Sequence, residues 1–165
     1  MLAPSPMIAA CLARELVPVD DILARAIAAP LASDGNGGAL TSFQLRRVVL
    51  FIEQNLDADL SLNRLAAVTS LSPSHFARRF KGATAMAPHQ YVLARRINGA
   101  KQLLLETEMK LAEIAIATGF SSQAHLTGMF GRTVGMTPGA YRTRRDACHA
   151  FLAAQGGEKQ MVTAA

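Results

Sequence analysis

Apolar residues recur at helical spacing along most of the chain, and the longest such stretch is residues 87–106. Positions three and four apart form one packed stripe here: Tyr91, Val92, Arg95, Arg96, Ala100, Leu103 and Leu104. Pro88 suits the first turn of a helix, where its missing N–H would have no partner. Gly99 in the middle of this stretch would destabilise a helix by about 1 kcal/mol relative to alanine. A closely packed neighbouring helix would explain a glycine at this position. The stretch therefore predicts one long helix.

The same spacing predicts shorter helices on both sides of the long one. Their predicted ranges are 41–55, 61–69, 72–81, 111–118, 121–132 and 138–144. Several of these helices have a Ser or Thr at the expected N-cap, with Thr41 or Ser42, Ser72, and Ser121 or Ser122 as the clearest cases. No stretch of useful length alternates between apolar and polar residues, so the predicted fold class is all-α.

The long helix separates two copies of one unit. Five positions match at an offset of 49 residues: Leu62, Leu65, Ala66, Thr69 and Ser72 with Leu111, Ile114, Ala115, Thr118 and Ser121. After a one-residue insertion, six more match at an offset of 50: His75, Phe76, Phe80, Met86, Pro88 and Tyr91 with His125, Leu126, Phe130, Met136, Pro138 and Tyr141. The agreement of apolar, turn and capping positions indicates a duplicated unit.

Each copy has the layout of a helix-turn-helix, at residues 61–82 and 110–133. Ala66 and Ala115 let the two helices of a copy cross closely, and the turns contain Ser70 or Gly119. Gly119 suits a backbone position with positive φ. The apolar residues of the second helices predict inward-facing side chains: Phe76, Phe80, Leu126 and Phe130. Polar and small residues are then left facing outward.

The net charge of +5 is unevenly distributed along the chain. Residues 40–145 hold 14 Lys and Arg against 6 Asp and Glu, whereas both flanking segments are slightly acidic. A basic, all-helical region points to a polyanionic partner, although charge alone does not separate it from an ordinary solvated surface.

Three segments carry a resemblance to a known family: SLNRLAAVTSLSPSHFARRFK, YVLARRINGAKQLLLET and LAEIAIATGFSSQAHLTGMFGRTVGMTPGAYR. Through these segments, residues 44–145 resemble the double helix-turn-helix DNA-binding domain of the AraC/XylS family of bacterial transcription regulators. The resemblance implies a seven-helix fold within residues 40–145 and sequence-specific binding of double-stranded DNA at promoters. It further implies a cytoplasmic, nucleoid-associated regulator with RNA polymerase as a second partner. No enzymatic activity, cofactor or metal is expected.

The resemblance also assigns candidate DNA-binding residues on the second helix of each copy. In the first copy these are Ser74, Ala77, Arg78 and Lys81. In the second they are Gln123, Ala124, Thr127, Gly128 and Arg132. Gly128 departs from the family pattern, in which long polar or basic side chains are common, and Gly131 follows it. The second helix of the second copy is therefore predicted to read DNA less specifically than its counterpart in the first copy.

Two further pairs of residues are interpreted as structural. His75 and His125 occupy matched positions and are expected near the core, within reach of a phosphate but not of a metal. Arg95 and Arg96 on the long helix are expected to pack or form ion pairs rather than to read bases.

The segments outside the duplicated region predict less. Residues 1–39 contain an amphipathic helical stretch at residues 7–28 and a glycine-rich linker at residues 33–38. The stretch would pack on the following domain or pair with its copy in a homodimer. Residues 146–165 are predicted to form a flexible tail. The chain start lacks a signal peptide's basic region, and no apolar run reaches the roughly 20 residues of a membrane span.

Competing interpretations stay open at this point. Cys148-His149 invites comparison with DNA-repair methyl-acceptor proteins, but no acid or second cysteine stands at activating spacing. Gly128 and Gly131 suggest a helical adaptor with weakened DNA binding. The short segment before the domain fits either a free-standing regulator or the tail of a longer, effector-responsive one.

Overall fold

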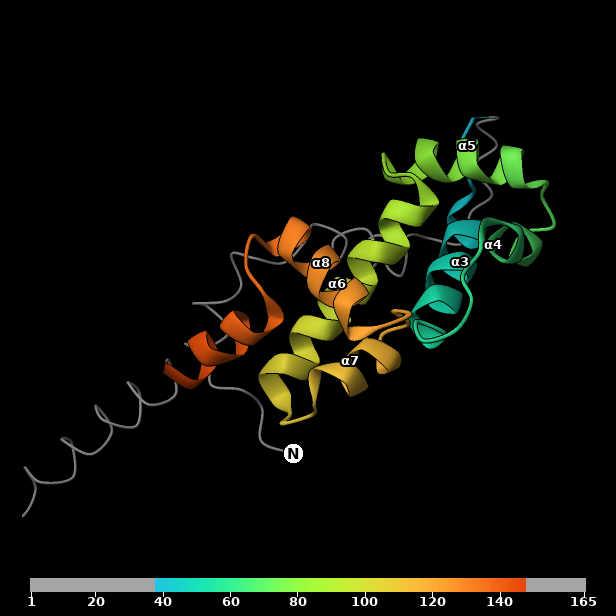
Figure 1. Cartoon of the computed structure of the whole chain (residues 1–165). Helices are drawn as coiled ribbons and strands as arrows, with labels where there is room; N and C mark the ends of the chain where they lie inside the picture. The colour runs from blue at the N-terminus through green and yellow to red at the C-terminus, as the bar shows by residue number, and fades with distance from the viewer. Residues whose placement is uncertain (1–37, 148–165) are drawn as a thin grey trace, which may run out of the picture.

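The computed structural model of the protein describes residues 38–147, and every regular element in that range is a helix. The labelled helices are α3 (Ser42–Gln54), α4 (Leu62–Val68), α5 (Pro73–Thr84), α6 (Pro88–Glu106), α7 (Leu111–Ala117) and α8 (Gln123–Val134) (Figure 1). Residues 138–147 are helical up to the end of the described range and are called the closing helix below. The all-α class and the order of the predicted helices are confirmed.

Three helices begin at caps that the sequence predicted. Thr41 Oγ1 accepts a hydrogen bond from the Gln44 amide at 3.2 Å, and the Gln44 side chain accepts one from the Thr41 amide at 3.2 Å. Ser72 caps α5 in the same position, followed by Pro73 in the first turn. For α8, where two serines were candidates, the cap is Ser122.

Two predicted boundaries were wrong. Helix α5 extends to Thr84 rather than ending near Lys81, and Ala85 ends it in the left-handed conformation with φ 59°. The closing helix continues past Arg144 through residue 147, so the predicted tail does not begin at residue 146. Residues 7–28, residues 33–37 of the predicted linker, Cys11 and Cys148 lie outside the described residues.

Helix α6 belongs to both copies of the repeat, and it runs between them in Figure 1. Its first half joins a core with α3, α4 and α5, in which Phe80 and Tyr91 meet edge to face with ring centroids 5.6 Å apart. Its second half joins a core with α7, α8 and the closing helix, in which Phe130 and Tyr141 repeat that contact at 5.4 Å. Each copy is therefore a unit of four helical segments with its own core.

This shared role explains why the predicted stripe on α6 was incomplete. Helix α6 also buries Ala94, Ile97, Asn98 and Lys101, which the single stripe omitted. A helix that packs against one neighbour at its start and different neighbours at its end buries more than one face.

Arg95 and Arg96 fix α6 to the first unit, which confirms the structural interpretation of both residues. Arg95 binds Glu53 through two hydrogen bonds of 2.7 Å. Arg96 donates to the carbonyl oxygens of Leu56 at 3.0 Å and Ala58 at 2.8 Å, in the loop after α3. Burial lowers the pKa of Arg96, against the opposing effect of nearby acidic groups.

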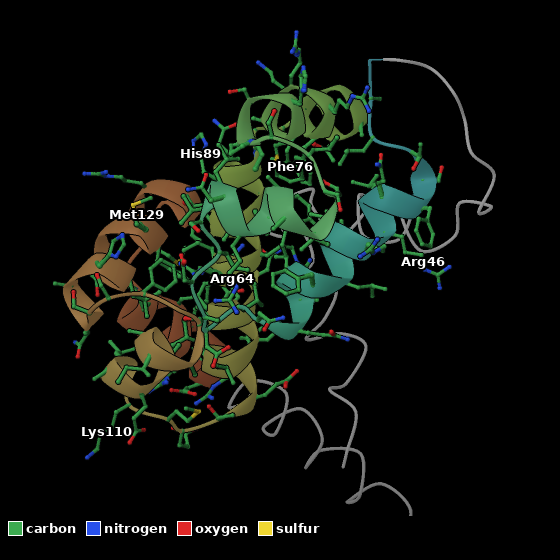
Figure 2. The ribbon with its side chains drawn as sticks, turned by 90° about the vertical axis from the view of Figure 1, so that its right-hand side faces the viewer. Arg46, Arg64, Phe76, His89, Lys110 and Met129 are labelled. Carbon is green, nitrogen blue, oxygen red and sulfur yellow. The ribbon has the colours of Figure 1, made fainter. Side chains whose placement is uncertain are left out.

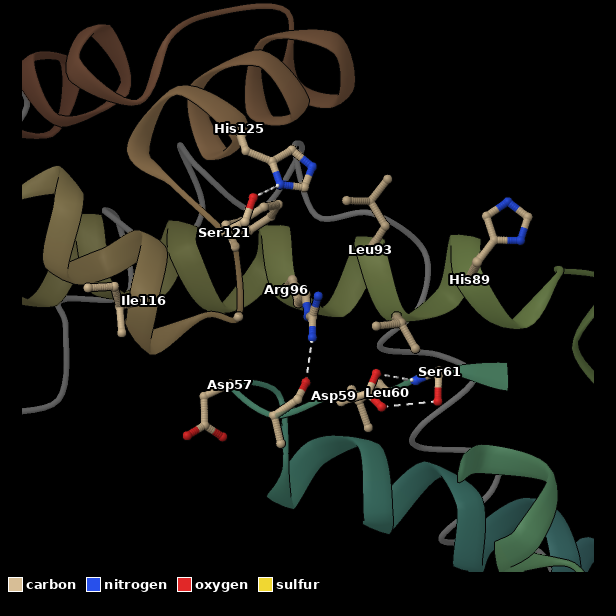
Figure 3. A pocket seen from close by; sticks show the side chains of 14 residues that line it. Asp57, Asp59, Leu60, Ser61, His89, Leu93, Arg96, Ile116, Ser121 and His125 are labelled. Atoms are coloured by element: carbon tan, nitrogen blue, oxygen red, sulfur yellow. Dashed lines mark hydrogen bonds between the residues drawn. The ribbon is translucent and has the colours of Figure 1, made fainter. Parts of the chain in front are cut away.

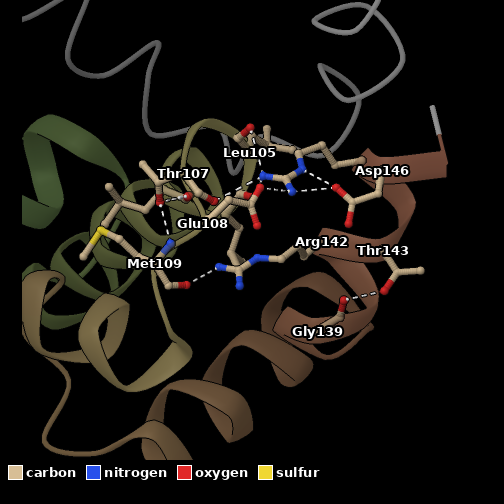
Figure 4. Close-up of polar contacts among 11 residues, drawn as sticks. Leu105, Thr107, Glu108, Met109, Gly139, Arg142, Thr143 and Asp146 are labelled. Carbon is tan, nitrogen blue, oxygen red and sulfur yellow. Dashed lines mark hydrogen bonds and ion pairs between the residues drawn. The ribbon is translucent and has the colours of Figure 1, made fainter. Parts of the chain in front are cut away.

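The second unit repeats this arrangement with Arg145 (Figure 4). Arg145 is buried and donates to the carbonyl oxygens of Leu104 at 3.0 Å and Thr107 at 3.2 Å. It also pairs with Glu108 and Asp146, both at 2.6 Å. Burial by itself lowers the pKa of Arg145, but its hydrogen bonds with Asp146 and Glu108 outweigh burial and raise it. Arg145 thus anchors the closing helix beyond its predicted end.

Gly119 makes the contact at which the two units meet. Its φ is 75°, as its turn position predicted. A Cβ at this position would overlap the carbonyl oxygen of Leu56 and lie 2.8 Å from the Arg96 guanidinium carbon. The turn of the second unit therefore rests directly on the loop of the first, and no larger residue fits there.

We expect Gly119→Ala to lower the free energy of unfolding by about 2–5 kcal/mol, since a left-handed alanine and an overpacked contact each contribute. Gly99→Ala is the matched control, because its Cβ would lie at ordinary contact distance, 3.6 Å, from Thr118 Cγ2. That variant should be neutral or stabilised by up to about 1 kcal/mol. Urea denaturation of the full chain measures both, and equal stability of the two variants would contradict the assignment.

Candidate nucleic-acid interface

The outward face of α5 carries the first group of candidate residues. Phe76 and Phe80 are fully buried at four-residue spacing, which turns the opposite side of the helix outward. Ser74, Arg78 and Lys81 are exposed there, and Ala77 is half-buried. Hydroxyl, guanidinium and ammonium groups thus share one helix face.

Helix α8 presents the second group in the same way. Leu126 and Phe130 are fully buried and hold the helix to the second core. The other side carries the candidate residues, exposed apart from the half-buried Thr127: Gln123, Ala124, Thr127, Gly128 and Arg132. The predicted orientation of the two faces is confirmed, whereas the role of each residue toward DNA stays a prediction. These two faces are called the reading faces below.

Gly128 and Gly131 stand in open space. A Cβ at either position would meet no atom within 4 Å among the described residues. Packing inside the described domain therefore does not require these glycines, and α8 projects no side chain at either position.

The predicted location of the two matched histidines was wrong, because His75 and His125 are both exposed. Each is the third residue of its helix, where the backbone amide, and not the ring, bonds to the serine cap. His125 Nδ1 is hydrogen-bonded to Ser121 Oγ at 3.0 Å, and its ring packs edge-on against Phe120 at 5.4 Å. In the part of the chain that the structure describes, no group of three or more His, Cys, Asp or Glu residues could hold a metal ion.

Basic side chains are spread beyond the reading faces. Figure 2 shows Arg46 and Lys110 pointing outward at opposite edges of the domain. The Arg64 guanidinium lies over the Phe51 ring, 5.9 Å from its centroid, and ties α4 to α3. The distribution of charge therefore does not identify the reading faces. They are identified by which sides of α5 and α8 are buried.

Two grooves lie beside the reading faces. The first, which we call the α5 groove, has a volume of about 530 Å³. It is lined by the α5 reading face together with apolar residues of α4 and the start of α6: Leu60, Leu62, Leu65, Ala87 and Pro88. His89 also lines it.

The second, which we call the central groove, has a volume of about 640 Å³ and takes residues from both units (Figure 3). Asp57, Asp59 and Ser61 come from the first unit, and Ser121 and His125 from the second. Leu60 and His89 line both grooves. Sequence reasoning missed His89, because it lies in the first turn of α6, outside both helix-turn-helix segments.

The chain matches known helix-turn-helix proteins. A sequence model of the helix-turn-helix domain family matches residues 65–144. Over 92 residues, 56% of this chain, it is 40% identical to the probable transcriptional regulator LumQ of Photobacterium leiognathi, of which it covers 37%. Over 100 residues, 61% of this chain, it is 32% identical to the melibiose operon regulatory protein of Escherichia coli strain K12, of which it covers 33%. The chain thus spans about a third of the length of these curated relatives.

Solved structures cover the described domain more completely. The DNA-binding domain of AdpA, a global transcriptional factor solved in complex with a target DNA, matches with a TM-score of 0.59 and 34% identity, covering 61% of this chain and 90% of that one. A transcriptional regulator with an AraC-type DNA-binding domain from Chromobacterium violaceum matches with a TM-score of 0.58 and 31% identity, covering 62% of this chain and 91% of that one.

Because nothing in the described domain crowds Gly128, we expect Gly128→Ala to leave the melting temperature unchanged or raise it, with a gain of up to about 1 kcal/mol. Gly128→Arg should keep that stability and add a cation to the α8 reading face, which raises affinity for a DNA duplex. Thermal melting and a fluorescence anisotropy titration on the same preparations test this. Lower DNA affinity at unchanged stability would mean that the DNA backbone approaches Gly128 too closely for a side chain.

Proposed function

This chain belongs to the AraC/XylS family of helix-turn-helix proteins, and we propose that it binds double-stranded DNA at promoters as a sequence-specific transcriptional regulator. In this proposal α5 and α8 each enter one of two successive major grooves on one side of the duplex. One chain then makes the two contacts for which a protein with a single helix-turn-helix needs a dimer.

The observation that carries the proposal is the pair of outward reading faces on two units joined by one continuous helix. Helix α6 has 19 residues, which corresponds to about 28 Å of length. One turn of B-DNA is about 34 Å, and the offset of α5 and α8 from the ends of α6 supplies the difference. The AdpA domain, which is similar to this one, was solved in complex with a target DNA and supports the same partner.

Individual side chains have distinct roles in this proposal. Arg78 can donate two hydrogen bonds to the O6 and N7 atoms of guanine, and Gln123 can bond adenine through N6 and N7. Each such pair contributes about 1–3 kcal/mol of discrimination between bases. Lys81 and Arg132 stand in the last turns of their helices and are assigned to phosphates.

The size, partners and location of the whole protein are further parts of the proposal. Because the chain spans about a third of its curated relatives, it can also be a piece of a longer, effector-responsive regulator. RNA polymerase as a partner, a homodimer formed through residues 7–28, and a cytoplasmic location at the nucleoid are parts of this proposal. A helical adaptor with weakened DNA binding is the second candidate, and the absence of side chains at Gly128 and Gly131 favours it.

DNA binding should be strongly electrostatic, because cations on the protein release the counterions of the phosphates they neutralise. With about six to ten phosphate contacts, we expect affinity to fall by roughly 10³–10⁵-fold between 50 and 200 mM salt. Anisotropy titrations of the full chain with a random duplex measure this. A flat salt response would favour the adaptor over the regulator.

We expect Arg78→Ala to weaken binding by about 1–3 kcal/mol and to relax base preference in one half of the site only, because a base-reading side chain acts locally. Arg64→Ala removes an exposed arginine outside the reading faces and should leave base preference unchanged. Selection of binding sites from a random library compares the two variants. Uniform weakening of every sequence by Arg78→Ala would reassign Arg78 to a phosphate.

A further inference from the structure

The central groove lies on the surface between the two reading faces. The α5 reading face borders the α5 groove, which meets the central groove at Leu60 and His89. At its other end the central groove reaches Ser121 and His125, where α8 begins. One continuous surface therefore leads from the first reading face to the second.

This continuity decides what would lie over the central groove. When two helices occupy successive major grooves on one side of a duplex, the minor groove between them and its two phosphate strands face the protein. If the protein binds DNA as proposed, these phosphate strands pass over His89 and His125. Figure 3 shows both imidazoles, with Leu93, along one side of α6, and Asp57 and Asp59 across the groove.

The charge of the central groove depends on these two histidines. Its other charged lining residues are Asp57, Asp59 and Arg96. With neutral imidazoles the lining carries a formal charge of −1, and with both protonated it carries +1. Histidine is the side chain that gains its charge between about pH 5 and 8. The charge that this groove presents to a phosphate thus depends on whether the imidazoles carry protons.

The neighbouring groups leave the imidazoles available to an outside partner. Arg96 donates to the carbonyls of Leu56 and Ala58, so its guanidinium is held in the protein. Both carboxylate oxygens of Asp59 accept hydrogen bonds from Ser61, at 3.0 and 3.1 Å. His125 uses Nδ1 toward Ser121, and its Nε2 has no hydrogen-bond partner among the described residues. Arg78 and Lys81 face His89 from α5 across the α5 groove.

The repeat provides an internal comparison. His89 corresponds to Gly139 at the offset of 50 residues, in the first turn of the closing helix. Of these two first turns, that of α6 lies between the reading faces and that of the closing helix does not. Gly139, in the closing helix, has no side chain. The imidazole therefore belongs to the place between the units and not to the duplicated fold.

We propose that His89 and His125 form a proton-dependent contact with the DNA backbone between the two major-groove sites, so that the protein binds DNA more tightly as pH falls from 8 to 6. The inference rests on the proposed DNA binding and adds a second, charge-switched contact to it. The sign follows from linkage, because a phosphate stabilises the charged imidazole and binding then takes up protons.

Anisotropy titrations of the full chain with a duplex carrying its selected site, at pH 6 and pH 8 over a series of salt concentrations, test the proposal. For the unaltered chain, Kd at fixed salt should fall by about tenfold between the two pH values, the change expected for roughly one linked proton across one pH unit. The slope of log affinity against log salt should steepen by about 0.9 for each added phosphate contact at pH 6.

Three variants assign the effect. His89→Gln with His125→Gln should remove both the pH response and the steepened slope, and His89→Lys should bind more tightly than the unaltered chain at pH 8. His75→Gln is the matched control, since His75 is exposed on α5 but lines neither groove. Melting temperatures at both pH values confirm folding, and His89→Gln alone replaces the double variant if that variant is unstable.

The possible results distinguish the histidine contact from DNA binding itself. A pH response that is lost with the groove histidines and kept in His75→Gln supports the proposal. DNA binding with no pH response, or with a response that the double variant keeps or His75→Gln abolishes, overturns it and leaves the proposed function standing. No DNA binding at any salt or pH would instead refute the proposed function.

Discussion

The contact of Gly119 with the Leu56 carbonyl fixes how the two helix-turn-helix units sit relative to each other. Arg96 donates to the same carbonyl, so one oxygen is shared by the loop of the first unit, the turn of the second and the helix that joins them. A backbone oxygen gives way less readily than the far end of a flexible side chain would. The separation and relative orientation of the two reading faces, and hence the DNA geometry they can match, depend on this contact.

Both units close with an arginine directed into backbone carbonyls, half-buried at Arg96 and buried at Arg145. Arg96 binds the loop after α3 and Arg145 the loop after α6, and the acceptors Leu56 and Ala58 in the first unit correspond to Leu105 and Thr107 in the second. An arginine suits this task because its planar guanidinium presents several donors in a fixed arrangement. The duplication thus extends past the helix-turn-helix segments to the interaction that fastens each unit to its last helix.

The basic excess of the domain divides into cations that hold the fold and cations that face outward. Arg95, Arg96 and Arg145 are engaged by carboxylates and carbonyls, whereas Arg78, Lys81 and Arg132 stand on the reading faces. The region between the reading faces has a different character, with two aspartates and two histidines in its lining. In the described domain, the lining between the two reading faces thus mixes acidic and imidazole groups, whereas the reading faces carry arginine and lysine.

The sequence alone determined the class, the helix order, the duplication and the outward sides of α5 and α8, because helical spacing and capping residues are local signals. It also assigned Arg95, Arg96 and Gly119 correctly. Tertiary structure decided what depends on residues distant in the chain: the burial of Asn98 and Lys101, the anchoring of the closing helix by Arg145, and the placement of His89 between the units. These follow from how two cores meet on one helix, which spacing within a single helix does not encode.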